Sequence, residues 1–347
     1  MPVIDQLGVV TSKSGVLIVI DTGYLNLWSH DRTPAVPDGL LSNDEVTKRA
    51  NSSVDLRIVG SDAERAGRLL GWSWHPLYVY DQPQGFSHLQ VKLDEIVRED
   101  HLDARLEVVT PRIPHRKRAD LALAQGSGAG EVQLHGISAV VIGNVPSDRE
   151  MSVLAERSES NPDCWRRVVV DCRSQSPIAR SERVGEVGVD YARLVIADLD
   201  AIGAWQHQES LDGKADYVFW GRDAHTVASA LRAPQISPSE FGWLDLAEDL
   251  TQQRGTAVEE YCDKHGLKLA GDYRPHSDHW RAMTPTRKSP TESATIELAG
   301  NLICNFMTTW GDGLFAVHRD LSESGELVQI RIEFEQAPAE QLGHLTQ

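Results

Sequence analysis

The chain has 347 residues, a length typical of two ordinary domains or one large one, and its 41% apolar and 24% charged residues exclude wholesale disorder. The formal net charge is −17, and residues 176–347 carry 27 acidic against 15 basic side chains. This balance argues against a nucleic-acid or membrane-surface binder, because both need clustered lysine and arginine. It suits a small molecule, in particular a cationic one, or a basic protein partner.

The predicted elements are mostly strands, since short runs rich in Val, Ile, Leu and Tyr recur along the whole chain. The expected strands are 16–20, 54–59, 77–80, 106–110, 131–134, 138–142, 167–172, 193–197, 216–220, 295–298, 302–307, 314–318 and 327–334. The expected helices are 63–70, 89–99, 224–231 and 257–265. Because long helical crossovers are scarce, we expect an α+β fold with mainly antiparallel sheets.

Four sequence blocks recur in the same order in the two halves of the chain. The apolar run 17–21 ends in Asp and is followed by a Trp-x-His, and 194–198 repeats this pattern. The other blocks pair 54–63 with 215–224, 114–115 with 275–276, and 131–136 with 295–300. We therefore predict a tandem duplication, with strand-rich repeats at 10–175 and 188–336 related by a pseudo-two-fold axis.

If the repeats superpose, five residues of the first should overlie five of the second. The expected pairs are Asp21 with Asp198, Trp28 with Trp205, Gly60 with Gly221, Asp62 with Asp223, and His115 with His276. Residues shared by the copies more often maintain a common fold, whereas positions at which the copies differ are better candidates for a function present once.

The recurring aspartates have a structural and a functional interpretation. Asp62 and Asp223 each precede a predicted helix, which favours a role as helix cap. Asp21 and Asp198 end predicted strands, where an aspartate often caps a turn. Strand ends also hold catalytic and metal-binding carboxylates rigidly, so the functional alternative stays open.

The Trp-x-His pairs, Trp28 with His30 and Trp205 with His207, would place both side chains on one face of a strand. One interpretation is structural packing of the indole against a hydrogen-bonded imidazole. The other is a divalent metal site, because His and Asp suit zinc, manganese or iron. In the second copy the ligands would be Asp198, His207 and His276, and in the first Asp21, His30 and His115.

The densest run of titratable residues is 272–281, in the second copy. His276, Asp278 and His279 are the candidate catalytic residues, since imidazole and carboxylate groups carry out general acid/base chemistry. The first copy instead has His115 followed by three basic residues, a run that favours an anion. A solvated loop is the alternative for both segments.

Two glycine-rich segments are better explained as turns. The segment 126–130 precedes a predicted strand and lacks a following Lys-Ser/Thr, so a flexible turn is favoured over a phosphate loop. The segment 310–313, Trp-Gly-Asp-Gly, lies between two predicted strands and favours a tight turn over a cation-binding loop.

The segment 310–317, together with Asp320 and Gly325, resembles the C-terminal signature of an uncharacterised bacterial domain-of-unknown-function family. The resemblance covers about the last 45 residues and implies a bacterial cytoplasmic origin without an activity. It is one-sided, because the first copy lacks the Gly-Asp-Gly motif.

A cytoplasmic location also agrees with the rest of the chain. The first residues lack the basic and apolar regions of a secretory signal, and no apolar run is long enough to span a bilayer. The four cysteines show no C-x-x-C spacing, so we expect reduced, buried thiols.

Two classes of function follow. The first is a binding or interaction protein, favoured by the acidic second repeat and by the lack of a specific catalytic motif. The alternative is a metal-assisted or general acid/base hydrolase with its site in the second repeat or at the seam between the repeats. A serine or cysteine nucleophile ranks lower, because no G-x-S-x-G elbow and no cysteine signature is present.

Overall fold

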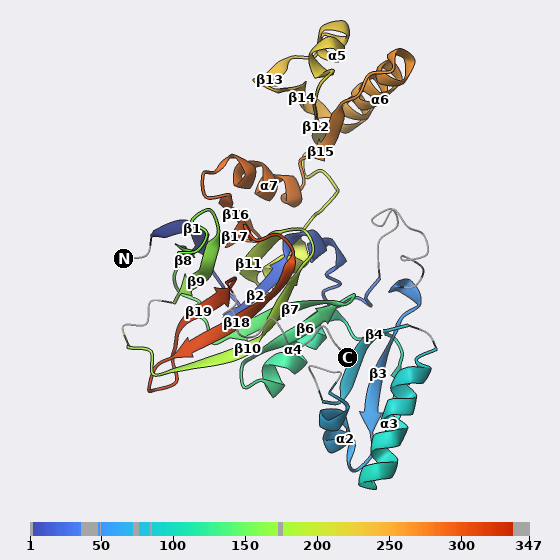
Figure 1. The fold of residues 1–347 in the computed structure, drawn as a ribbon, viewed down its shortest axis with the longest axis vertical. Coiled ribbons are helices and arrows are strands. Elements are labelled where there is room, and N and C mark those ends of the chain that lie inside the picture. Colours follow the sequence, from blue (N-terminus) through green and yellow to red (C-terminus); the bar gives the residue numbers. More distant parts are fainter. Residues whose placement is uncertain are drawn as a thin grey trace. The chain divides into compact units, whose positions relative to one another are not determined.

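The structure is a computed structural model that describes residues 3–35, 48, 50–71, 76–83, 85–172 and 176–335. The chain divides into two compact units (Figure 1), which we call unit 1, Met1–Ala204 with Thr286–Gln347, and unit 2, Trp205–Pro285. Both contain helices and antiparallel sheets, so the predicted α+β class is confirmed. Within the described ranges no helix has the length and hydrophobicity needed to cross a membrane.

Two six-stranded antiparallel sheets form the body of unit 1. In the first, the strands in spatial order are β1 Ile4–Val10, β8 Met151–Arg157, β9 Trp165–Asp171, β19 Leu327–Glu333, β18 Gly313–Leu321 and β10 Arg180–Val189. In the second they are β16 Ser293–Leu298, β17 Asn301–Met307, β11 Arg193–Asp198, β2 Val16–Asp21, β7 Ile137–Gly143 and β6 Ala129–Leu134. Strands β10 and β6 are therefore edge strands.

One hydrophobic core joins side chains from both of these sheets. Alternate residues of β2, Leu17 and Val19, point into it, as period-2 side-chain alternation requires. From the first sheet Val168 and Ile330 enter the same core, and all four side chains are fully buried. The apolar runs that predicted strands are thus the runs that this core covers.

In each six-stranded sheet, three neighbouring strands come from the first half of the chain and three from the second half, and their order is mirrored about the centre of the sheet. In the second sheet, for example, β6, β7 and β2 run from one edge to the centre, and β16, β17 and β11 run from the other edge. At the centre of the second sheet β2 pairs antiparallel with β11, with Asp21 opposite Leu194 and Leu17 opposite Asp198. This order is the one expected of a tandem duplication, while the duplication and its pseudo-two-fold axis stay predictions. Each sheet takes strands from both halves, so the repeats at 10–175 and 188–336 do not correspond to units 1 and 2. The last residues of the predicted first repeat, 173–175, lie outside the described residues.

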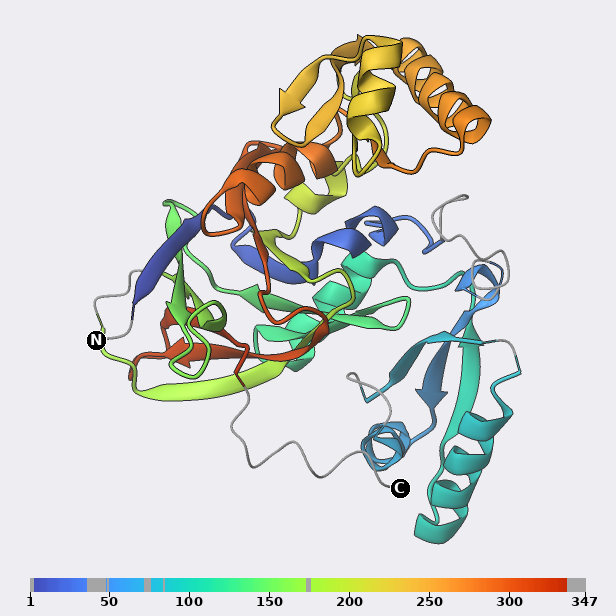
Figure 2. The ribbon, with the colours of Figure 1, turned by 45° about the horizontal axis from the view of Figure 1, so that its top comes forward.

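The remaining elements of unit 1 are a three-stranded sheet and its helices. The strand order is β4 Tyr78–Gln82, β3 Val54–Val59 and β5 Arg105–Val109. The helices are η1 Thr22–Leu27, α2 Ala63–Leu70, α3 Ser87–Asp100, α4 His115–Gln125 and η2 Ala201–Ala204. Helix α4 packs against β6 and β7 (Figure 2), which places its C-terminal end beside the edge of the second sheet.

Unit 2 is built on a four-stranded sheet. Its strands in spatial order are β13 Gln235–Ser237, β14 Glu240–Ala247, β12 Lys214–Trp220 and β15 Ala270–Pro275. The helices are α5 Ala224–Leu231, α6 Glu248–His265 and α7 Asp278–Lys288, and the last three residues of α7, 286–288, are assigned to unit 1. Phe219, Val227 and Val258 hold α5 and α6 against the sheet in a core of their own.

Several sequence expectations need correction. Helices 63–70 and 224–231 are confirmed, whereas 89–99 and 257–265 are parts of the longer α3 and α6. Helices α4 and α7 were not predicted, because α4 has no clear apolar stripe and α7 contains Pro285. The Trp-x-His segments at 28–30 and 205–207 are loops that follow 3-10 helices, not strands.

Candidate functional site

Unit 2 contains an open pocket of about 610 Å³ beside the end of β15. Its lining combines carboxylates, an imidazole, two guanidinium groups and an indole. The lining residues are Leu211, Asp212, Asp216, Arg274, His276, Trp280, Arg281, Thr284 and Pro285. The pocket thus contains one of the predicted catalytic residues, His276.

His276 is held between aspartates that come from three separate segments. Its Nδ1 lies 3.0 Å from Asp212 Oδ2, and its Nε2 lies 3.2 Å from Asp216 Oδ1 and 3.9 Å from Asp245 Oδ1. Burial alone would lower the pKa of His276, but the hydrogen bonds and charges of Asp212 and Asp216 outweigh it and raise that pKa. The hydrogen bond from His276 in turn lowers the pKa of Asp212. The imidazolium form is therefore favoured, with both ring nitrogens donating to carboxylates.

Asp216 and Asp245 form a pair that unit 1 also contains. In unit 2 the Asp245 N–H donates to Asp216 Oδ1 at 2.8 Å, and in unit 1 the Asp81 N–H donates to Asp55 Oδ1 at 3.0 Å. Asp81 and Asp245 share a left-handed backbone, with φ of 55° and 56°. In unit 1 the buried guanidinium of Arg118 contacts both aspartates, and Arg112 also pairs with Asp81.

No arginine neutralises the pair in unit 2, whose residues are all described. The cationic group that contacts it there is His276, and the Asp245 side chain is 74% exposed. Asp216, which lines the pocket, and the exposed Asp245, which contacts His276, therefore form a carboxylate pair of the kind that binds a guanidinium inside unit 1.

Arg274 lines the pocket without neutralising these carboxylates. Its guanidinium lies 5.1 Å from the Trp280 ring centre and 5.9 Å from that of Trp220, and its Nη2 lies 3.2 Å from Asp272 Oδ2. Aromatic faces on this scale stabilise a cation. Arg274 is thus held by Trp220, Trp280 and Asp272.

Asp278 and His279, the other predicted catalytic residues, do not line this pocket. Asp278 begins α7, where its carboxylate accepts hydrogen bonds from the Gln206 N–H at 3.0 Å and from Arg281 Nη1 at 2.8 Å. His279 is buried and stacks on His207 with ring centres 4.3 Å apart. These contacts are structural, because they fix the loop before β12 to the start of α7.

The predicted metal set Asp198, His207 and His276 is not assembled within either unit. Asp198 belongs to unit 1, and in unit 2 the His207 Nδ1 accepts the Trp205 indole N–H at 3.1 Å. Across the described ranges, no group of three or more His, Cys, Asp or Glu side chains is arranged to hold a metal ion. Metal binding therefore stays a hypothesis, and the arrangement of these described residues does not support it.

Asp198 and Asp21 are turn caps, as the structural interpretation predicts. Asp198 accepts five hydrogen bonds, from the N–H groups of Asp200, Ala201 and Ser14 and from the hydroxyls of Ser12 and Ser14. Asp21 accepts three, from the N–H groups of Gly23, Asp190 and Tyr191. Each carboxylate ties the end of its own strand to the turn that precedes the partner strand.

Asp62 and Asp223 stand at the N-cap positions of α2 and α5, but neither makes a capping hydrogen bond within its helix. Asp62 Oδ2 accepts the Asp103 N–H at 2.9 Å, and Asp223 Oδ2 accepts the Lys268 N–H at 2.8 Å. The predicted N-cap positions are therefore correct, but the predicted capping hydrogen bonds are not formed. Each aspartate anchors the loop before the neighbouring strand.

The first-copy histidines do not form a metal site with Asp21. His115 is fully buried, its Nδ1 accepts the Ser29 N–H at 3.0 Å, and its ring stacks on Trp28. Burial first, and then the charge of Arg118, hold the pKa of His115 well below its ordinary value. His30 instead pairs with Asp31 at 2.8 Å.

The basic run after His115 is also not an anion-docking surface. Arg118 is buried in its ion pairs, and Arg116 pairs with Asp120 and Asp200, which leaves Lys117 exposed. Consecutive residues of a helix point in different directions, so these adjacent basic side chains of α4 lie in different environments.

The two glycine-rich segments agree with the turn interpretation. Residues 126–128 form the turn between α4 and β6, and residues 308–312 connect β17 to β18. Asp312 Oδ1 accepts the Ala192 N–H at 2.9 Å, which fixes this connection to the start of β11. The described cysteines, Cys164, Cys172, Cys262 and Cys304, are buried free thiols.

Sequence reasoning singled out none of the three aspartates around His276 as a site residue. Asp216 lies in a recurring block, so the repeat comparison could have singled it out. Asp212 and Asp245 carry no such signal, because they come from loop and strand segments that only the fold brings to His276.

Comparisons with protein families, with curated proteins and with solved structures find no match for this chain. The resemblance of residues 310–317 to an uncharacterised bacterial family therefore stays a hypothesis. The function has to be inferred from the residues and their geometry.

Proposed function

We propose that this chain is a binding protein whose unit 2 recognises a basic group, the arginine or lysine side chain of a protein partner, in the pocket around His276. The observation that carries the proposal is the Asp216–Asp245 pair. The equivalent pair in unit 1 binds the guanidinium of Arg118, whereas the pair in unit 2 is open to the surface.

The charges of unit 2 support a basic partner. Its sequence has 13 acidic and 8 basic residues, and a surplus of carboxylates attracts a cationic partner over a distance. Asp212, which lines the pocket, is 50% exposed, and Asp245, which lies beside His276, is 74% exposed. Both can therefore accept hydrogen bonds from an incoming ammonium or guanidinium group without leaving His276 unpaired.

The contacts of His276 favour binding over general-base catalysis. A general base needs a ring nitrogen that is free to take a proton. Both ring nitrogens of His276 instead face aspartate oxygens within 3.2 Å. The acid/base or metal-assisted hydrolase stays the alternative hypothesis.

A calorimetric titration with a pair of matched ligands tests the proposal. The ligands are N-acetyl-arginine amide and N-acetyl-citrulline amide, which have nearly the same shape but differ in charge. We expect the arginine compound to bind and the citrulline compound not to bind. The double variant Asp212→Asn/Asp245→Asn should weaken arginine binding roughly threefold to tenfold, as expected for two exposed ion pairs.

The matched control is Glu260→Gln/Asp263→Asn, which removes the same charge from exposed positions of α6. It should leave binding unchanged. Equal binding of both ligands, or equal weakening by both double variants, would contradict a site at His276. Metal analysis of the purified protein addresses the alternative: a stoichiometric metal lost on His276→Ala would favour the hydrolase.

A further inference from the structure

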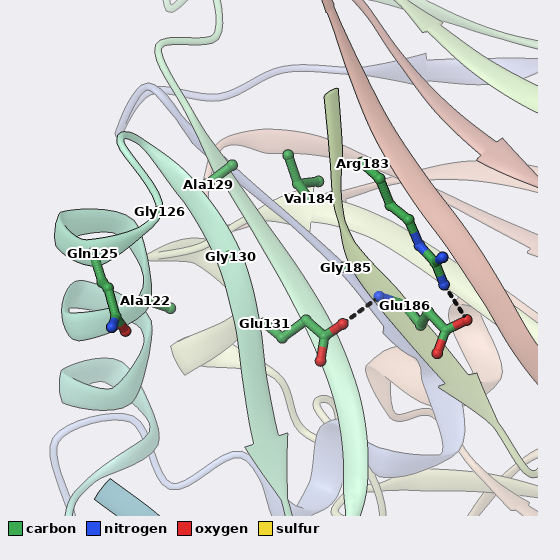
Figure 3. Close-up of a pocket in the computed structure, with 10 residues that line it drawn as sticks. All are labelled: Ala122, Gln125, Gly126, Ala129, Gly130, Glu131, Arg183, Val184, Gly185 and Glu186. Atoms are coloured by element: carbon green, nitrogen blue, oxygen red, sulfur yellow. Dashed lines mark hydrogen bonds and ion pairs between the residues drawn. The ribbon is translucent and has the colours of Figure 1, made fainter. Parts of the chain in front are cut away.

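A second pocket, of about 550 Å³, lies in unit 1 between the edge strands β6 and β10 and the C-terminal end of α4. Figure 3 shows the Glu131 carboxyl group reaching from β6 towards the backbone of β10. Small residues keep the pocket open: Ala122, Gly126, Ala129, Gly130 and Gly185. Neither the proposed function nor the fold accounts for both carboxylate oxygens of Glu131.

One carboxylate oxygen of Glu131 has a structural partner and the other has none. Oε1 accepts the Glu186 N–H at 2.5 Å. Oε2 is buried without a hydrogen-bond partner, and the residue as a whole is 9% exposed. A buried carboxylate oxygen without a partner is costly, so its retention calls for a donor. Glu131 lines the pocket, so a group bound there can supply that donor.

The bulge in β10 is shaped around this side chain. The pairing of β10 with β18 shifts between Arg183 and Gly185. A Cβ atom on Gly185 would lie 2.2 Å from Glu131 Cγ, closer than any real contact, so the glycine provides the space that Glu131 fills. The carboxyl group is therefore placed by the backbone of the opposite sheet.

The two sheets also meet at their opposite corner, where the edge strands β1 and β16 contact each other. This second joint shows which side chain is enough to connect the sheets. There β1 has a bulge at Gly8, and the Val9 N–H donates to Thr295 Oγ1 at 3.0 Å. The Thr295 hydroxyl donates in turn to the Val9 carbonyl at 3.3 Å, so the hydroxyl and both backbone groups of Val9 are paired. A threonine, with one side-chain oxygen, is thus enough to join the sheets. The second carboxylate oxygen of Glu131 is not needed for that contact.

From this geometry we propose that the β6–β10 pocket binds a small organic cation with N–H donors, a primary alkylammonium group, which donates to Glu131 Oε2. The charged neighbours on β10, Arg183 and Glu186, pair with each other at 2.5 Å and do not compete for that oxygen. The side chains of Ala122, Ala129 and Val184 offer apolar contact to a short alkyl stem.

The ionisation of Glu131 is consistent with this ligand. Burial raises the pKa of Glu131 to about 7, and the hydrogen bond from the Glu186 N–H offsets burial only in part. The carboxyl is therefore partly uncharged near neutral pH. A bound ammonium group supplies the missing donor and stabilises the carboxylate form.

An NMR titration of the full chain with n-butylammonium chloride tests the proposal, and tetramethylammonium chloride is the matched probe without an N–H donor. We expect saturable shifts of the Gly130, Glu131, Gly185 and Glu186 amides and of the Glu131 carboxyl carbon with n-butylammonium alone. Both Glu131→Gln and Glu131→Thr should weaken this binding at least about tenfold, because a charge-assisted hydrogen bond is lost. Glu323→Gln, in an exposed turn, should not change it.

The threonine variant reproduces the side chain of the opposite corner and should keep the joint intact, which the Glu186 amide shift monitors. Absence of a saturable shift in the wild-type protein would overturn the proposal. So would equal shifts with tetramethylammonium, or unchanged binding in both Glu131 variants. Because the shifts are assigned to residues of unit 1, the result is independent of binding at His276.

Discussion

The guanidinium of Arg118 lies 3.2 Å from both carboxylate oxygens of Asp55, and neither side chain is exposed. The same guanidinium contacts both oxygens of Asp81 at 2.9 and 3.1 Å. It also donates to the carbonyl oxygens of Ile113 and Gln133. Arg118 thereby connects β3 and β4 of the small sheet to α4 and β6.

Removing this guanidinium should destabilise the protein strongly. We expect Arg118→Met to lower the free energy of unfolding by about 3–5 kcal/mol, because the buried carboxylate of Asp55 loses its counter-charge and Asp81 keeps only Arg112. Urea denaturation followed by circular dichroism measures the change. Arg105→Met is the control, since the Arg105 side chain is 67% exposed in its pair with Glu107 and should contribute less than about 1 kcal/mol. Equal losses in both variants would contradict the role given to Arg118.

The ion pairs of His276 predict a pH dependence of stability. The pKa of His276 is raised in the folded protein, so its contribution is fully present below the ordinary value of about 6.5 and is lost as pH rises through the folded value. Denaturant midpoints of the wild type and His276→Asn should therefore differ most at mildly acidic pH and converge at alkaline pH. A difference that grows with pH would reverse the sign assigned to this site.

The same pKa can be followed directly by NMR of the imidazole nitrogens. Asp212→Asn removes the partner of Nδ1 and should lower the titration midpoint of His276. Asp249→Asn, at an exposed position of α6, removes an equal charge and should leave that midpoint unchanged. An identical shift in the two variants would point to net charge in place of the hydrogen bond.

Asp62 and Asp223 should behave alike although they belong to different units. Each accepts a backbone N–H that fixes the loop before a strand, so Asp62→Ala and Asp223→Ala should each lower the midpoint of thermal unfolding. Thermal unfolding of each variant beside the wild type measures this change. Ligand binding at His276 should remain in the folded fraction. Loss of that binding with unchanged thermal stability would make the residue functional.

Local sequence predicted the elements whose local signals agree with their tertiary environment. Helix α2 ends where Gly71 adopts the left-handed conformation, and α5 follows the same apolar pattern, so both ranges were correct. Strands with continuous apolar runs, such as β2 and β11, were recognised because both of their faces are buried. The exposed edge strand β10 was missed, since its polar side chains carry no such pattern.

For the candidate site, the sequence by itself determined that His276 repeats His115 and that the residues after these two histidines differ between the copies. Only the tertiary structure decided that Asp212, Asp216 and Asp245 surround it, while Asp278 and His279 turn into the interior. It also decided that one oxygen of Glu131 is buried without a partner. Residue type and spacing specify which groups can be charged, but the strand register and loop closure that bring distant segments together determine which of those charges are neutralised.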